Sequence, residues 1–125
     1  MGTIFGLELA QEASAQRGAW GTMSWLVEDR TVEGMGLSLA RMSVAPGQAS
    51  PAHSHPDCHE IIHLVSRTVE QTADGRRYQL SAGDTVVVGP GRVHRTRNLN
   101  DAHPAELLVC YSAGMRIYQP ESEAP

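Results

Sequence analysis

The sequence predicts an all-β domain. Its apolar segments are short and rich in β-branched residues, glycine and proline lie between them, and residues 8–17, the one stretch with helical propensity, lack a clear apolar stripe. Many short strands with regular turns are typical of a β-sandwich or β-barrel. The expected strands are residues 23–27, 37–44, 60–66, 78–80, 85–88, 94–98, 106–111 and 115–118, with turns at 46–47, 73–75, 82–84, 89–91 and 98–104.

Length and charge narrow the class of protein. A chain of 125 residues forms one domain, and its net charge of -4 argues against nucleic-acid binding. No apolar run approaches the roughly 20 residues that span a bilayer, and residues 1–10 lack the basic start and apolar core of a signal peptide. We therefore expect a cytoplasmic protein with no membrane partner. In such a chain Cys58 and Cys110 are expected to be free thiols.

Histidines and one carboxylate suggest a metal site. His53 and His55 are one residue apart in a segment that Pro51 favours as extended, so both imidazoles can face one cavity. Glu60 opens an apolar run, where a buried carboxylate is costly unless it is paired or bound to a metal. His94 begins another expected strand. Imidazoles and a carboxylate are good ligands for zinc, manganese, iron, cobalt or nickel.

Two motifs in the chain resemble those of the cupin family. The first consists of Gly47, His53-Ser54-His55 and Glu60; the second consists of Gly83, Pro90-Gly91, His94 and Asn98. The resemblance spans residues 37–111. It implies a double-stranded β-helix, a jelly-roll-like barrel, as the fold of a small single-domain protein. The expected divisions are an N-terminal arm or strand (1–18), the barrel (19–119) and a disordered tail (120–125).

The resemblance also implies a metal centre in which His53, His55, Glu60 and His94 hold one divalent ion, which could be iron, manganese, nickel or zinc. Two departures from the family pattern stand out. Arg67 occupies a place where the motif has glycine, so we expect that turn to be built differently. Pro90 comes one residue late, but the spacing from Gly91 to His94 and Asn98 is intact.

His59 is the alternative third ligand. Adjacent residues of a strand face opposite ways, so either His59 or Glu60 faces the metal. Glu60 is favoured because that register puts Ile62 and Leu64 inside and His63 outside. The other register gives a site made of histidines only. His63 and His103 are expected to be structural or surface residues.

Strand alternation also predicts a substrate pocket. With Arg41 outside, Ala40 and Met42 face the cavity together with Ile62, Leu64 and Thr96. Either Cys110 or Tyr111 enters from the last long strand, and Cys110 is taken as the pocket residue. Arg92 lies at the barrel mouth by resemblance, as an anion contact or as a solvated loop residue. Trp20 and Trp25 are expected in the core or an interface, or over the mouth.

The chain has no Gly-x-Ser-x-Gly, phosphate-loop or dinucleotide motif, so its chemistry, if any, belongs to the metal. Three hypotheses follow. The first is a metalloenzyme (oxygenase, lyase or isomerase) acting on a small organic molecule. The second is a non-catalytic small-molecule binding or sensor module, and the third is a structural metal in an interaction protein. A homodimer is expected, because family members commonly pair and a small barrel exposes strand edges.

Overall fold

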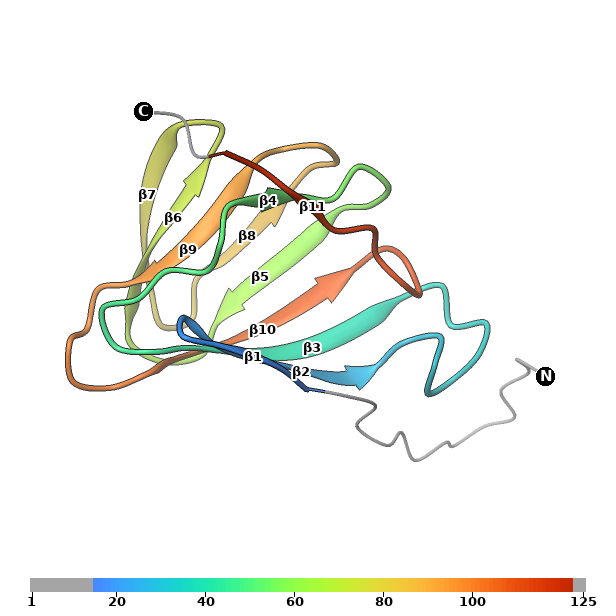
Figure 1. The fold of residues 1–125 in the computed structure, drawn as a ribbon, viewed down its shortest axis with the longest axis horizontal. Coiled ribbons are helices and arrows are strands. Elements are labelled where there is room, and N and C mark those ends of the chain that lie inside the picture. Colours follow the sequence, from blue (N-terminus) through green and yellow to red (C-terminus); the bar gives the residue numbers. More distant parts are fainter. Residues whose placement is uncertain (1–14, 123–125) are drawn as a thin grey trace.

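The computed structural model describes residues 15–122, which form two antiparallel sheets facing each other (Figure 1). The order of the six-stranded sheet is β1-β2-β3-β10-β5-β8: β1 (Ala15–Gly18), β2 (Gly21–Val27), β3 (Ser38–Val44), β10 (Ala105–Tyr111), β5 (Glu60–Leu64) and β8 (Thr85–Val88). The order of the five-stranded sheet is β11-β4-β9-β6-β7: β11 (Gln119–Pro120), β4 (His53–Ser54), β9 (His94–Asn98), β6 (Thr68–Ala73) and β7 (Arg76–Ser81). This double-sheet, jelly-roll-like arrangement confirms the all-β prediction.

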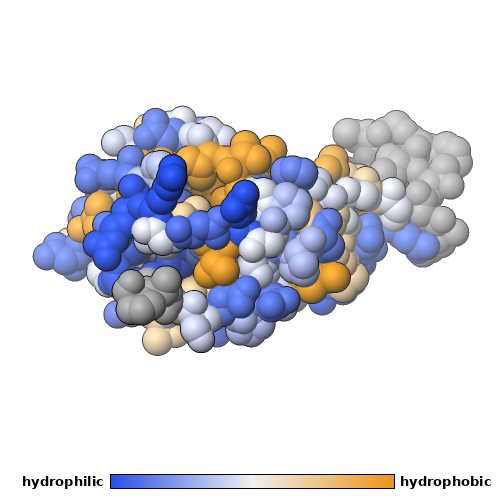
Figure 2. Space-filling view, turned by 90° about the horizontal axis from the view of Figure 1, so that it is seen from above, coloured by the Kyte–Doolittle hydropathy of each residue, from blue (hydrophilic) through white to orange (hydrophobic). Residues whose placement is uncertain are grey.

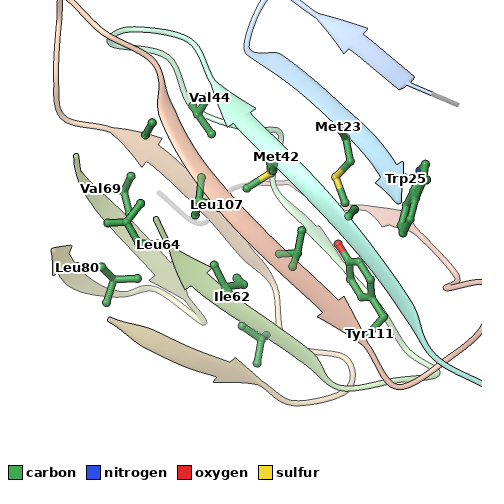
Figure 3. Close-up of a cluster of buried hydrophobic side chains, with 14 of the residues drawn as sticks. Met23, Trp25, Met42, Val44, Ile62, Leu64, Val69, Leu80, Leu107 and Tyr111 are labelled. Atoms are coloured by element: carbon green, nitrogen blue, oxygen red, sulfur yellow. The ribbon is translucent and has the colours of Figure 1, made fainter. Parts of the chain in front are cut away.

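The core lies between the two sheets. Figure 3 shows Met42, Ile62, Leu107 and Tyr111 pointing into it from β3, β5 and β10. Burial alternates along β3, where Arg41 is exposed between buried Ala40 and Met42, as the period of two predicts. The surface seen from above is mostly hydrophilic, with smaller hydrophobic patches (Figure 2). Burial of apolar side chains between the facing sides of the two sheets therefore stabilises the fold.

Strand β6 is not among the strands that the sequence predicts. Its residues Thr68–Ala73 include one fully apolar buried side chain, Val69, and one buried amide, Gln71. The Gln71 carbonyl oxygen Oε1 accepts a hydrogen bond from the Thr96 hydroxyl at 2.6 Å, which satisfies a polar group inside the core. The strand is stabilised on both sides, by β7 and by β9. Because this buried position is a glutamine that the neighbouring strand of the same sheet satisfies, the sequence of β6 shows no alternation of apolar residues.

At the N-terminal end, the part of the expected arm or strand (1–18) that the structure describes is a strand: Ala15–Gly18 pairs with β2, and residues 1–14 lie outside the described residues. The C-terminal end differs from expectation. The expected strand at 115–118 is absent, and Gln119–Pro120 pairs instead with β4. Residues 120–122 were expected to be disordered, but the Glu121 carboxylate accepts a hydrogen bond from the Ser54 hydroxyl at 2.9 Å. Residues 123–125 of that predicted tail lie outside the described residues.

The turn at Arg67 corrects another expectation. The residue that replaces the motif's glycine still adopts a φ of 73°, so the left-handed turn is kept rather than rebuilt. A non-glycine residue in this region is crowded by its Cβ, at a cost of about 1–2 kcal/mol. The exposed Arg67 therefore marks a small local strain in the fold.

Arg67→Gly is expected to raise the free energy of unfolding by about 0.5–1 kcal/mol, because the steric cost removed exceeds the backbone entropy that glycine adds. Urea titration measures this change. The control is Arg41→Gly, at an exposed position inside β3, where glycine should lower stability. A loss of stability in Arg67→Gly would contradict the account of this turn.

Candidate metal centre

Four side chains from both sheets converge at one end of the sandwich. His53 lies on β4 and pairs across to His94 at the start of β9, which brings two imidazoles together within the five-stranded sheet. Glu60 begins β5 in the opposite sheet, and His55 follows β4 directly. One possible ligand atom from each residue lies within 4.8 Å of all the others. His55, Glu60 and His94 are buried, and His53 is half-buried.

The backbone fixes how the three imidazoles are presented. Each donates its Nδ1–H to a backbone carbonyl oxygen: His53 to Pro51 at 2.7 Å, His55 to Ile117 at 2.8 Å and His94 to Arg92 at 2.9 Å. A carbonyl oxygen only accepts, so Nδ1 carries the proton in all three rings and Nε2 is the atom left for a ligand. This outer hydrogen bonding is the arrangement that orients histidines which bind metals.

The Nε2 atoms of two of these rings meet the Glu60 carboxylate. Glu60 Oε1 lies 2.8 Å from His94 Nε2 and 3.2 Å from His55 Nε2. The His55 Nε2 atom is buried and has no hydrogen-bond partner of good geometry. A buried donor or acceptor left alone costs free energy, and a metal ion among four converging N and O atoms would satisfy it. The donor set therefore fits one divalent ion.

The pKa shifts of the cluster residues are compatible with binding a divalent cation. Burial alone would raise the pKa of Glu60, but the neighbouring His55 and His94 imidazoles lower it to about 2. Burial, with the neighbouring His94, lowers the pKa of His53 to about 4. Burial would also lower the pKa of His94, but the hydrogen bond to Glu60 raises it above its usual value. Near neutral pH the centre thus holds one carboxylate, and protonation of His94 Nε2, which Glu60 favours, competes with a metal for that atom.

Metal affinity is therefore expected to rise as the pH increases through and above the ordinary histidine pKa of 6.5. Because the pKa of His94 is raised, its proton competes with the metal from a higher pH than on a free imidazole. Glu60 stays ionised and His53 stays neutral over this range. Zinc affinity, measured by competition with a chromophoric chelator at several pH values, checks this. An affinity that is flat across the range would contradict it.

The structure brings Glu60, and not His59, into the cluster. His59 is exposed, and its backbone N–H donates to the Ser112 hydroxyl at 2.9 Å. His63 lies on the opposite face of β5 from the centre, with its Nδ1 2.8 Å from the Thr85 hydroxyl. His103 is exposed in the loop before β10. None of these three histidines belongs to the cluster.

A cavity of about 300 Å³ adjoins the cluster. It is lined by Gln16, Arg17, Trp20, Met23, Met42, Ser50, Pro51, His53, Glu60, Ile62, His94, Thr96, Tyr111, Arg116 and Tyr118. Of the expected pocket residues, Met42, Ile62 and Thr96 are in this lining. Ala40 and Leu64 are fully buried in the core and do not reach it. Trp25, also expected in the core, packs there against Tyr111.

Cys110 does not line this cavity, which corrects the expectation for that strand. Tyr111 pairs with Glu60 across β10 and β5, so its side chain shares the inner face with that carboxylate. Cys110 pairs with the exposed Ile61 and therefore faces the outer side. Burial raises the pKa of Tyr111, and the charge of Glu60 adds to the effect.

The segment after β10 lies against the cluster, which the sequence does not predict. Tyr118 stacks on His53 with ring centroids 4.7 Å apart, and the Ile117 carbonyl holds His55. The aromatic and charged residues at 116 and 118 alternate with Ile117, a pattern that indicated a strand but not its return over the cluster. Arg92, expected either as an anion contact at the mouth or as a solvated loop residue, is exposed, pairs with Asp74 at 2.8 Å and lies outside the cavity lining.

The fold and the cluster define a β-sandwich protein with a potential His₃/Glu metal site. Residues 40–111 match the family described as Cupin domain, so the chain belongs to the cupin family. A germin-like protein 3-8 of Oryza sativa subsp. japonica is 33% identical over 86 residues, which cover 65% of this chain and 38% of that protein. A germin-like protein of Morus alba is 37% identical over 97 residues, which cover 65% of this chain and 46% of that protein.

Solved structures share the fold at lower identity. The oxalate decarboxylase of Lactobacillus farciminis, in a formate complex, superposes with a TM-score of 0.78 at 18% identity, over 86% of this chain and 33% of that one. An oxalate oxidase superposes with a TM-score of 0.74 at 20% identity, over 92% of this chain and 62% of that one. The chain thus spans less than half the length of the germin-like relatives named above. Within residues 15–122, no helix is long and apolar enough to cross a membrane.

Proposed function

We propose that the chain is a metalloenzyme that acts on a small organic molecule at the cluster of His53, His55, Glu60 and His94. One observation carries the proposal: three Nε2 atoms, each directed by a carbonyl at Nδ1, converge with a buried carboxylate beside a cavity. A divalent metal with these four ligands and an octahedral preference keeps two open positions, where it supplies Lewis-acid chemistry or, if redox-active, dioxygen chemistry.

The protein's own residues would orient the substrate and limit water. Met42 and Ile62 form an apolar wall, and Tyr118 covers the His53 ring by stacking on it. The Tyr111 ring lies edge-on to His55, with centroids 5.0 Å apart, and fills the inner side of the site. A small, largely apolar cavity with a few polar groups is typical of small-molecule sites.

The reaction class we propose is that of an oxygenase, lyase or isomerase. The solved neighbours, a decarboxylase and an oxidase of oxalate, support a lyase or an oxygen-dependent reaction. Manganese is the first metal to test, because a further structural neighbour, the oxalate decarboxylase of Bacillus subtilis, has Mn(II) centres. The homodimer stays a prediction.

The test is turnover by protein that has been loaded separately with manganese, iron, nickel or zinc. Small organic acids are supplied while dioxygen uptake, carbon dioxide release and product NMR signals are followed. We expect product that depends on one metal and disappears in His53→Ala. Tight ligand binding without product under every metal would contradict an enzyme and indicate a binding or sensor module.

A further inference from the structure

Segment 112–121 passes beside the cavity and contributes the cationic side chain of Arg116 to its lining. It is held at three points: the Ile117 N–H donates to the Asp57 carboxylate at 3.1 Å, β11 pairs with β4, and Glu121 accepts from Ser54. Arg116 and Tyr118, on either side of Ile117, both line the cavity. The fold therefore positions Arg116 beside the metal ligands through contacts of the residues that follow it in the chain.

The Arg116 guanidinium lies against three aromatic rings. Its Cζ atom is 4.7 Å from the Trp25 ring centroid, 5.2 Å from that of Tyr111 and 5.1 Å from that of Tyr118. Cation–π contact stabilises the charge and fixes the plane of the fork, but it does not pair the charge with an anion. Tyr111 and Tyr118 also contact His55 and His53 respectively, so the same rings link Arg116 to the cluster.

Arg116 forms no ion pair with an acidic residue among residues 15–122; the pairs Arg30–Glu28 and Arg92–Asp74 involve other arginines. Its Nε atom is buried and lacks a hydrogen-bond partner. A buried donor without a partner is costly, and a carboxylate would satisfy it with a charge-assisted bond. Arg17, the other cation of the cavity lining, is exposed on β1 and is not held in this way.

We infer that Arg116 binds a carboxylate of the substrate, so that the substrate class is small carboxylic acids with a second oxygen able to reach the metal. The cavity of about 300 Å³ is at the small end of ligand sites, which suits such a molecule. The inference rests on the proposed function, because it assigns the second oxygen to the metal. Arg116 is then a specificity-determining residue of the same site.

The test uses full-length protein loaded with cobalt(II), whose visible spectrum reports ligands that reach the metal. Pyruvate is the probe with a carboxylate, and pyruvamide is its neutral counterpart. We expect Arg116→Gln to weaken pyruvate binding at least about tenfold while cobalt content and pyruvamide binding stay as in the native protein. The matched control Arg17→Gln should bind both probes as the native protein does.

Equal pyruvate affinity in Arg116→Gln and native protein would overturn the inference. Equal weakening of both probes, or a native cobalt protein that binds neither probe, would also overturn it. If Arg116→Gln does not fold, Arg116→Lys replaces it, because lysine keeps the charge but lacks the paired N–H donors of the guanidinium. Unchanged pyruvate affinity in Arg116→Lys would overturn the inference. Failure of the native protein to take up cobalt would instead contradict the proposed function.

Discussion

Glu60→Ala is expected to lower divalent-metal affinity by at least about 100-fold, since removing even an outer partner of a metal ligand costs 10–100-fold. The substitution removes the only carboxylate of the cluster. It also removes the group that Nε2 of both His55 and His94 faces, at 3.2 and 2.8 Å. Three imidazoles, which carry no negative charge, would remain to hold a divalent cation.

The control for this experiment is the adjacent residue. His59→Ala changes an exposed side chain outside the cluster, so metal affinity should stay at the native value. Zinc and manganese affinities of both variants are compared by titration against a competing chelator. Full affinity in Glu60→Ala together with a loss in His59→Ala would reverse the assignment of the third ligand.

Ile62→Ala is expected to lower the free energy of unfolding by about 2–5 kcal/mol, because it leaves a cavity in the packed core. Ile62 is 1% exposed, at the centre of β5, and is surrounded by β8 and β10. The loss combines the transfer free energy of the deleted groups with the dispersion attraction that their former neighbours no longer have. Urea unfolding of both proteins at neutral pH measures the difference.

Ile61→Ala is the matched control, with the same side chain one position earlier. Ile61 is 43% exposed and faces outward, so its loss should cost no more than about 0.5 kcal/mol. Similar losses in the two variants would contradict the register of β5. Comparing Ile62→Ala with Ile61→Ala therefore also tests the alternation that places Glu60, two residues before Ile62, on the inward face of β5.

Alternation made the strands near the site predictable. In β3, β5 and β9 every second residue is buried, which is the period of two that strands have. The same period placed Glu60 and Ile62 on one face, and the structure has them there. The spacing of the glycines in the second motif was equally informative, because Gly83 and Gly91 adopt φ values of 97° and 77° that other residues avoid.

Other features depend on contacts that are distant in sequence. The sequence of β6 lacks an alternation of apolar residues because one of its two buried positions is Gln71, whose amide is hydrogen-bonded by Thr96 of the neighbouring strand. The choice between Cys110 and Tyr111 required the pairing of β10 with β5, which no local pattern contains. The course of segment 112–121 is set by pairing with β4, and the hydrogen bond that secures its end joins residues 67 positions apart along the chain. A residue other than glycine can also adopt the left-handed backbone conformation, as Arg67 does at the position where the motif has glycine.

The cluster of His53, His55, Glu60 and His94 is expected to hold one metal ion. The test is the metal content, by elemental mass spectrometry, of the native protein and His53→Ala, both purified without an affinity tag. We expect nearly one equivalent of manganese, iron, nickel or zinc in the native protein and a loss of that metal in the variant. A native protein that contains no metal and cannot be reloaded with any of the four would contradict it.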